Sequence, residues 1–557
     1  MAILSLVAIG VLVITIWAVT RYRRMTLLSR HGFPGPRPHF LFGNMLEIHA
    51  KGGLSSIYDE WHQKYGPIVG FYLGGVPNLV VADQELLKKV MVTDFTTFHR
   101  HQPFVKGGPN AVGPVKTHLV FNRSLDDWRR KRTLLSPAFT SAQLRYMIPS
   151  MTSIVDNFIK AISPMADSEE FSIVQHVSRT TLGVIARVAF GVGFGYAADS
   201  SRQSSQEWEK MAEGMTRVVR VTINDITFGK LMVLLPELTF IWYPLRLVID
   251  NILFFFSATP ESKLLDISRK VLNTRVKANK ITGDTETNGK RRDLMQILMN
   301  ARQQLDQKFN DSDFEMKTTE SIVSDSTNNE TNRYSSSKTI TLTDDDVICQ
   351  IYPVLAAGYE TTAVTLQYLM YNLANHQDIQ DQLRLEISKL KVNEDGLYDY
   401  ESLMFESPFM IAVVRETLRL YTPLPSLVTR IADIDYHYDG RTIPAGTGVI
   451  SSVMPMHLSE TFWPEPFKWK PSRHLTADGQ KLIPPKSEYA YQPFGHGPRN
   501  CVGMRLAYLE INLVLVKLMT TFRILPGPST ETGRLKTKES YGTMAPVNPI
   551  YIKLKLL

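Results

Sequence analysis

The chain of 557 residues contains only two cysteines, Cys349 and Cys501. Two cysteines cannot build a disulfide framework, so we expect the body of the protein to lie in a reducing compartment, on the cytosolic side of any membrane. The chain also lacks a Gly-rich nucleotide-binding loop, a separate flavin domain and any dedicated nucleic-acid motif. The formal net charge of +8 therefore suits an anionic membrane surface or an acidic partner, and no nucleic-acid partner is expected.

Charged residues are absent from residues 2–20, a largely apolar run close to the roughly 20 residues that span a bilayer as a helix. Arg21, Arg23 and Arg24 follow directly, and basic residues on this flank favour a cytosolic location for the rest of the chain. A cleaved signal peptide is the alternative, but its charges would precede the apolar run, and no small-residue cleavage site follows. We interpret residues 1–24 as an uncleaved membrane anchor with a basic stop.

The remaining chain divides by composition. Prolines stiffen residues 25–43, through the sequence FPGPRP, and indicate a hinge, after which residues 44–557 form one large catalytic domain. Residues 308–340 are polar, with few apolar anchors, and predict a flexible loop insertion. The apolar stretch 240–256 is too interrupted by charge to span a membrane. It either dips into a membrane surface or forms a buried core helix.

The most specific segment is FGHGPRNCVG, residues 494–503, which places Cys501 between glycines and just before a long apolar run. A cysteine at a helix N-terminus faces unpaired backbone N–H groups, so we expect a lowered pKa and a ready anionic ligand. Arg499 adds a cation suited to a carboxylate. A flat cofactor that carries carboxylates and binds a thiolate indicates haem. The alternative is a buried, inert cysteine after a Gly-rich turn.

This segment resembles the haem-binding loop of cytochrome P450 monooxygenases. The resemblance extends from the hinge to the C-terminus and is strongest to the animal microsomal group that contains drug- and steroid-oxidising liver enzymes and thromboxane synthase. It implies a mainly α-helical P450 fold with a small β-rich region near the hinge and after Pro423. It also implies haem b, iron protoporphyrin IX, with Cys501 as axial thiolate ligand. The family's Phe, Gly, Arg, Cys and Gly are met by Phe494, Gly497, Arg499, Cys501 and Gly503.

A long helix is predicted over residues 343–375, with a threonine N-cap and an Asp-rich first turn. Its sequence AGYETT resembles the oxygen-activating motif of the P450 central helix. The Thr361 hydroxyl can bond back to the Ala357 carbonyl and open the helical ladder, while Glu360 with Thr361 forms an acid–alcohol proton relay. Pro353 should kink the helix one turn earlier. Close helix packing and a solvent-facing glutamate are the alternative readings of this motif.

Glu416 and Arg419 stand three residues apart on a predicted helix and can pair. Alone, this would be an ordinary surface ion pair of little value. In the P450 family such a pair is buried and joined by an arginine from a later Pro-x-Arg segment, here Arg473. The resemblance therefore implies a structural role behind the haem loop for these three residues. His474 stands where the family usually has an aromatic residue.

Further cofactor contacts are implied along the chain. Trp128 and Arg132 lie one helical turn apart, and both are donors that can hold a haem propionate. Arg430, in a strand-like stretch, matches the family in the same way, and His101 does so more weakly. The bases at 129–131 sit where the family docks its electron donor, with a solvated helix face as the alternative. Residues placed by position in the substrate pocket are Pro353, Ala357, Leu427 and Val428.

The resemblance implies a monooxygenase that inserts one oxygen atom from O2 into a lipophilic substrate, such as a steroid, lipid or xenobiotic. Electrons would come from a separate NADPH-cytochrome P450 reductase, with cytochrome b5 as an additional partner, so NADPH acts only indirectly. We expect a single-pass protein of the endoplasmic reticulum membrane with a cytosolic catalytic domain. One alternative is a haem-thiolate isomerase that rearranges a lipid peroxide without a reductase; Glu360 and Thr361 argue against it. The other is a non-catalytic haem-binding sensor.

Overall fold

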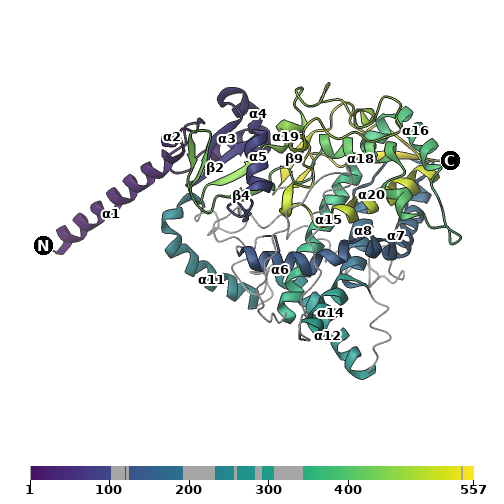
Figure 1. Cartoon of the computed structure of the whole chain (residues 1–557), viewed down its shortest axis with the longest axis horizontal. Helices are drawn as coiled ribbons and strands as arrows, with labels where there is room; N and C mark the ends of the chain where they lie inside the picture. The colour runs from purple at the N-terminus through teal and green to yellow at the C-terminus, as the bar shows by residue number, and fades with distance from the viewer. Residues whose placement is uncertain are drawn as a thin grey trace.

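The computed structural model describes residues 2–101, 119–120, 124–191, 233–255, 260–282, 292–306, 343–540 and 543–557. Helices and small sheets form one body, from which the N-terminal helix α1 (Ala2–Met25) projects (Figure 1). This mainly α-helical architecture confirms the predicted fold class. The insertion predicted at residues 308–340 lies outside the described residues.

The helices account for most of the described chain. The longer ones in the body are α4 (Leu54–Tyr65), α6 (Leu125–Leu135), α7 (Ser141–Ile162), α8 (Val174–Phe190), α11 (Thr239–Phe255), α12 (Pro260–Thr282), α14 (Leu294–Asp306), α15 (Asp344–Asn375), α16 (Gln377–Ile387), α18 (Pro408–Leu420) and α20 (Met504–Thr521). Shorter helices are α2 (Leu27–Arg30), α3 (Met45–Ala50), α5 (Gln84–Lys88), α17 (Tyr400–Met404) and α19 (Val453–His457). A π-helix, η1 (Lys89–Thr93), continues α5. Single 3-10 turns are η4 (Ser136–Phe139), η5 (Ser163–Met165), η7 (Pro236–Leu238), η8 (Pro471–His474), η9 (Glu488–Ala490) and η10 (Gly497–Arg499).

In the described part of the chain, strands form four small sheets. The largest has the order β1-β2-β7-β4, in which β2 and β7 run parallel and the other two pairs are antiparallel. It joins residues near the hinge to residues after Pro423, where the sequence predicts the β-rich region. Its strands are β1 (Ile68–Leu73), β2 (Val76–Val81), β4 (Thr429–Ile431) and β7 (Gly448–Ser451). The others are β3 (Phe171–Ser172) with β11 (Tyr551–Leu556) and β8 (Phe522–Leu525), β5 (Tyr436–Tyr438) with β6 (Arg441–Ile443), and β9 (Thr537–Ser540) with β10 (Thr543–Pro546).

The central helix α15 begins where the sequence predicts. The Thr343 hydroxyl accepts a hydrogen bond from the Asp346 backbone N–H at 3.1 Å, and the Asp346 carboxylate accepts one from the Thr343 backbone N–H at 3.1 Å. This reciprocal capping box satisfies two of the donors that a helix N-terminus leaves without partners. The helix then continues through Pro353 to Asn375, as predicted.

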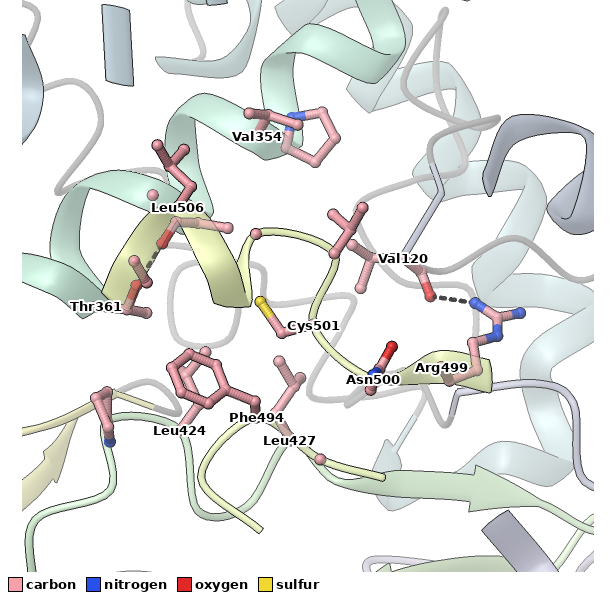
Figure 2. A pocket seen from close by; sticks show the side chains of 18 of the residues that line it. Val120, Val354, Thr361, Leu424, Leu427, Phe494, Arg499, Asn500, Cys501 and Leu506 are labelled. Atoms are coloured by element: carbon pink, nitrogen blue, oxygen red, sulfur yellow. Dashed lines mark hydrogen bonds between the residues drawn. The ribbon is translucent and has the colours of Figure 1, made fainter. Parts of the chain in front are cut away.

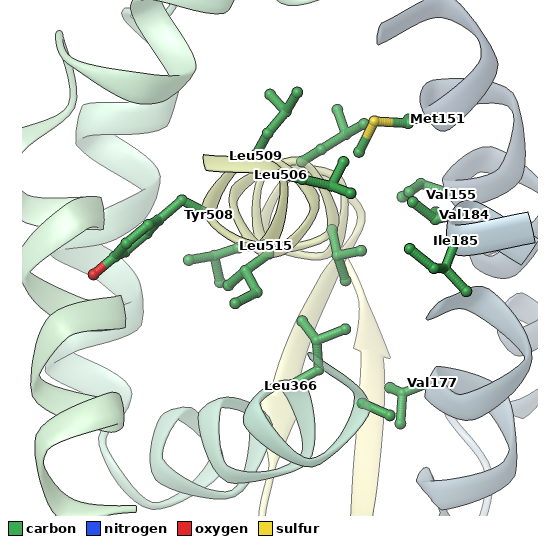
Figure 3. Close-up of a cluster of buried hydrophobic side chains, with 14 of the residues drawn as sticks. Met151, Val155, Val177, Val184, Ile185, Leu366, Leu506, Tyr508, Leu509 and Leu515 are labelled. Atoms are coloured by element: carbon green, nitrogen blue, oxygen red, sulfur yellow. The ribbon is translucent and has the colours of Figure 1, made fainter. Parts of the chain in front are cut away.

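The helix that follows Cys501, α20, lies in the centre of the helical bundle (Figure 3). Side chains from three other helices point toward it, including Met151 from α7, Ile185 from α8 and Leu366 from α15, and all three are buried. Helices α8 and α15 approach closely at Gly358, where a Cβ atom would lie 2.5 Å from Ile185 Cδ1. Because interiors pack this densely, the core fixes α20 and the loop that precedes it.

Arg21 joins the base of α1 to the body and is fully buried. Its Nε donates to the Phe40 carbonyl at 2.8 Å, its Nη2 donates to the Leu41 carbonyl at 2.7 Å, and its Nη1 lies 3.2 Å from Oε1 of Glu237. Arg24 Nη1 lies 3.2 Å from the same oxygen. From the sequence, these arginines are expected only to flank the predicted membrane anchor. The structure places Arg21 between α1, the segment that contains Phe40 and Leu41, and η7, which directly precedes α11.

Helices α1 and α11 expose several large apolar side chains each. Within Ile3–Met25, a window of 18 residues has a mean hydropathy of 2.6 and contains no buried residue, so this helix is long and apolar enough to be a candidate membrane span. Helix α11 exposes Phe240 (72%), Val248 (59%) and Ile252 (51%). Those exposures contradict the alternative that residues 240–256 form a buried core helix.

Candidate active site

A cavity of about 270 Å³ lies between helices α6 and α15, the loop that precedes α20, and the segment leading into β4. It brings together most of the site residues that the sequence predicts. Glu360, which is buried on α15, and Gly497 do not line it. The predicted residues that do line it are His101, Trp128, Arg132, Pro353, Ala357, Thr361, Leu427, Val428, Arg430, Phe494, Arg499, Cys501 and Gly503.

The loop around Cys501 is closed by a hydrogen bond from its backbone N–H to the Phe494 carbonyl at 2.9 Å. Gly495 and Gly497 have φ of 69° and 70°, in the left-handed region that favours glycine. At Gly497 a Cβ atom would also lie 2.1 Å from the Met91 carbonyl oxygen. The absence of a side chain at this position therefore lets the loop pack against η1. Figure 2 shows that the sulfur of Cys501 points into the cavity.

Burial raises the pKa of the Cys501 thiol, although the Gly503 N–H and the Arg132 guanidinium act in the opposite direction. The sequence-based prediction of a lowered pKa is therefore wrong for the protein alone. Helix α20 begins only at Met504, so the thiol precedes its first turn, and the loss of hydration outweighs the nearby donors. Cys501 is nevertheless exposed to the cavity, where a bound metal ion would deprotonate it.

Three arginines in the cavity wall, Arg132, Arg430 and Arg499, are called the cavity arginines below. Arg132 extends from α6, where its Nη1 donates to the Asn500 carbonyl at 2.9 Å and its Nη2 donates to Asn500 Oδ1 at 2.8 Å. Burial lowers the pKa of Arg132, and the neighbouring Cys501 partly offsets this effect. The side chain therefore holds the residue that precedes the cysteine.

Arg430 is almost fully buried in β4. Its Nη1 and Nη2 donate to the carbonyl groups of Thr429 at 2.8 Å and His496 at 3.3 Å, and its Nε has no partner among the described residues. Burial lowers the pKa of Arg430 to about 10. The guanidinium thus retains a donor that the described protein groups do not use.

Arg499 donates to the carbonyl groups of His99, Leu119 and Val120 and lies 4.5 Å from the centroid of the Trp128 ring. Burial and the neighbouring Arg430 and Arg132 lower the pKa of Arg499 to about 9. The sequence predicts a carboxylate partner for this arginine. In the structure these three bonds run to backbone carbonyl groups, and Figure 2 shows the one to Val120.

His101 lies beside the cavity arginines as a neutral side chain. Burial, together with Arg430 and Arg499, holds its pKa well below 6.5, and its Nδ1 has no partner among the described residues. The cavity arginines form a cluster of buried cations, which is costly unless an anion neutralises it. The unused donors and the excess positive charge therefore fit a ligand with carboxylate groups.

On the opposite wall, α15 contributes three threonines, Thr361, Thr362 and Thr365. The Thr361 hydroxyl donates to the Ala357 carbonyl at 2.6 Å, the bond that the sequence predicts, and the Thr365 hydroxyl donates to the Thr361 carbonyl at 2.8 Å. Each bond diverts a carbonyl from the regular ladder and loosens the helix beside the cavity. Thr361 faces the cavity, whereas Glu360 is turned into the protein.

Comparison with known proteins decides the family. The sequence model described as Cytochrome P450 matches residues 33–554 of the chain. The chain belongs to the cytochrome P450 family. Among its relatives, Cytochrome P450 3A41 of Mus musculus is 30% identical over 99% of this chain and 97% of the relative. Cytochrome P450 3A14 of Cavia porcellus and lithocholate 6-beta-hydroxylase of Mesocricetus auratus are each 29% identical over 94% of this chain and 91% of their own length.

Membership makes this protein a P450 monooxygenase, an enzyme that works with haem held by a cysteine thiolate. Its relatives are animal P450 enzymes, which agrees with the group that the sequence motifs indicate. The predicted structural residues Glu416, Arg419 and Arg473 lie outside the cavity.

Behind the loop, Glu416 and Arg419 of α18 are fully buried, with Arg419 Nε donating to Glu416 Oε2 at 2.8 Å. Arg473 Nε donates to Glu416 Oε1 at 2.9 Å. His474, whose role the sequence leaves open, places its Nε2 3.0 Å from Glu416 Oε2. Although burial opposes ionisation, hydrogen bonds from Arg419 and His474 lower the pKa of Glu416 to about 2. We call these four residues the Glu416 cluster.

The bases after Trp128 differ in exposure. Lys131 is buried and its Nζ lies 2.5 Å from Asp127, which also pairs with Arg130. Arg129 is 40% exposed and lies 3.8 Å from Asp126. Lys131 therefore presents no charge to a docking partner, and Arg129 is the most accessible of the three bases.

Sequence reasoning missed Glu510. This glutamate lies in the apolar run of α20, is 2% exposed and lines the cavity. The available signal was a carboxylate inside a helix whose neighbours are apolar, because charged residues are rarely fully buried without a partner. Asn500 was also missed, since its partner Arg132 is distant in sequence.

Proposed function

We propose that this P450 inserts one oxygen atom from O2 into a lipophilic substrate at a haem b whose iron is bound by Cys501. The observation that carries the proposal is the position of Cys501. Its sulfur enters an apolar cavity that also contains Thr361 and the cavity arginines. A thiolate, a hydroxyl in an opened helix and a set of buried cations are the parts that this reaction needs from the protein.

The cavity arginines, with Trp128 and His101, would hold the haem propionates. The unused Nε of Arg430 and Nδ1 of His101 support this assignment, because each is a polar atom without a partner among the described residues. Two carboxylates would also neutralise the positive region. When bound, the haem would supply the activation of dioxygen.

The chain's own residues would orient the substrate and move protons. Leu427 and Val428, with Pro353 and Ala357 on α15, form apolar walls that exclude water and favour a lipophilic substrate. Thr361 would orient water in the opened helix, while Glu360 would hold a proton nearby. The Glu416 cluster would keep the cysteine loop in place, with Phe494, Gly497 and Gly503 shaping it.

We further propose that electrons come from a separate NADPH-dependent reductase, with cytochrome b5 as an additional donor. The enzyme would be held at the endoplasmic reticulum membrane by α1, with its body on the cytosolic side. The exposed apolar face of α11 supports a lipid contact, because Glu237 in η7, directly before this helix, pairs with Arg21 at the base of the anchor.

The absorption spectrum of the reduced, carbon monoxide-bound protein tests the role of Cys501. We expect a strongly red-shifted Soret band in the wild type and its loss in Cys501→Ala. Cys349→Ala is the matched control, because this buried cysteine lies on α15 outside the cavity wall and should leave the band unchanged. A wild-type protein that contains haem but lacks the band would contradict the proposal.

Substrate oxidation that depends on reductase and NADPH tests the reaction itself. Each turnover should consume one O2 and one NADPH and yield one oxidised product and one water. Rearrangement of a lipid peroxide without reductase would instead support the isomerase alternative.

A further inference from the structure

Asn500 lies in the cavity wall between η10 and Cys501, and Figure 2 shows it on the same loop as the cysteine. Its backbone carbonyl accepts a hydrogen bond from Arg132 Nη1 at 2.9 Å, and its side-chain Oδ1 accepts one from Arg132 Nη2 at 2.8 Å. A planar guanidinium fits two such acceptors at once, so this pair of bonds fixes the orientation of Arg132 as well as its position. One residue of the cysteine loop therefore holds an arginine of α6.

Both acceptor atoms of Asn500 are neutral. They hold the guanidinium without cancelling its charge, whereas the carboxylate of Glu416 cancels the charge of Arg419. Arg132 forms no ion pair with a carboxylate in the described part of the chain. Its charge acts on Cys501, where burial raises the pKa of the thiol and Arg132 opposes that rise. The asparagine thus keeps an uncompensated cation next to the cysteine.

We propose that Asn500 is a positioning residue that holds the Arg132 guanidinium beside Cys501, where the positive charge stabilises the thiolate and raises the reduction potential of the iron bound there. This inference rests on the proposed function. Reduction adds one electron, supplied by the reductase, to an iron that carries a thiolate, so the centre becomes more negative. A fixed cation nearby stabilises the more negative state, and the residue that holds this cation tunes the metal through it.

The reduction potential of the haem-loaded protein tests this role. In Asn500→Ala the side-chain acceptor is lost, so Arg132 is no longer fixed beside the thiolate. We expect the equilibrium constant for one-electron reduction to fall by about tenfold, a shift of about 59 mV to lower potential. Asn375→Ala is the matched control and should keep the wild-type potential, because its amide donates to the Tyr371 carbonyl at 3.0 Å outside the cavity wall. An unchanged potential in Asn500→Ala would overturn the proposal.

Asn500→Asp separates the effect of charge from the effect of structure. Aspartate has nearly the same shape as asparagine, so it keeps both bonds to Arg132, but its carboxylate cancels the charge of the guanidinium. The red-shifted Soret band of the carbon monoxide-bound protein should persist, while the potential should fall at least as far as in Asn500→Ala. A purely structural role of Asn500 predicts the wild-type potential in Asn500→Asp, and that result would refute the proposal.

A double-mutant cycle shows whether Asn500 acts through Arg132. Arg132→Met removes the charge and should lower the potential by itself. If Asn500 acts by holding this charge, Asn500→Ala should cause no further fall in the Arg132→Met background. A fall of the same size in both backgrounds would show that Asn500 acts independently of Arg132, contrary to the proposal. If Arg132→Met binds too little haem for the measurement, the potential of Asn500→Asp gives the decision.

The two proposals fail in different ways. A wild type that contains haem but lacks the red-shifted Soret band refutes the proposed function, and the inference about Asn500 fails with it. A wild type that shows the band, together with wild-type potentials in Asn500→Ala and Asn500→Asp, refutes only the role of Asn500 and leaves Cys501 as the ligand.

Discussion

Arg419 and Arg430 are both buried, yet their surroundings differ. Arg419 shares the carboxylate of Glu416 with Arg473 and His474, so the protein itself supplies the anion. Arg430 donates to two backbone carbonyl groups, keeps an unused Nε and forms no ion pair with a described carboxylate. The first arrangement is complete in the folded chain. The second has no carboxylate among the described residues, which fits the proposed binding of an anionic ligand.

The largest expected effect comes from removing the anion of the complete cluster. Glu416→Gln leaves Arg419 and Arg473 buried without a carboxylate, so we expect the free energy of unfolding to fall by about 3–5 kcal/mol. Chemical unfolding of the two proteins measures the difference. Glu465→Gln is the control, since this carboxylate pairs with Lys468 at the surface and should not change stability measurably. A stable Glu416→Gln variant would show that the cluster does not depend on its anion.

Lowering the pH should remove part of the same stabilisation from the wild type, because it protonates Glu416. The pKa of Glu416 is about 2 in the folded protein and therefore lies below its ordinary value of 4.5. Its contribution to stability is fully present above pH 4.5 and disappears as pH falls through about 2. This contribution is on the order of 3 kcal/mol.

The difference in stability between the wild type and Glu416→Gln should therefore narrow as pH falls from 5 toward 2. Unfolding curves at several pH values give this difference directly. A gap that stays constant with pH would mean that the carboxylate is not the source of the loss.

Parallel substitutions in the two arginines sharpen the contrast. Arg430→Met removes a buried charge that has no anion, so the protein without haem should be as stable as the wild type or more stable. Its haem should dissociate about 10- to 100-fold faster, because a charge-assisted hydrogen bond contributes about 1.5–3 kcal/mol. Arg419→Met should instead destabilise the protein. Unfolding curves and the transfer of haem to an acceptor protein measure both effects.

Equal destabilisation by Arg430→Met and Arg419→Met would remove the distinction between the clusters. Unchanged haem retention in Arg430→Met would remove Arg430 from the propionate site.

The sequence predicted the features that depend on residues close together along the chain. The threonine cap and aspartates predict α15 to within a residue, and the glycines and cysteine of the loop before α20 locate the cavity. The pKa of Cys501 could not be predicted, because burial is set by packing of distant segments. For the same reason the Arg21–Glu237 pair was missed, since 216 positions separate its partners. Glu510 was missed because a single glutamate in an apolar run resembles an exposed face residue.

The smallest expected effect concerns a charge at the surface. There, water solvates the guanidinium, so neither a buried carboxylate nor an anionic ligand is needed. Arg129 is 40% exposed and only 3.8 Å from the exposed Asp126, so Arg129→Ala should leave the free energy of unfolding within about 0.5 kcal/mol of the wild type. If this base docks the electron donor, reductase-supported turnover should fall a few fold at low salt. The loss should disappear at high salt, because screening weakens exposed charge pairs. Arg129→Lys keeps the charge and should retain wild-type turnover. A loss in Arg129→Ala that is independent of salt would place the defect in folding of α6, and no loss at any salt would exclude Arg129 from the docking surface.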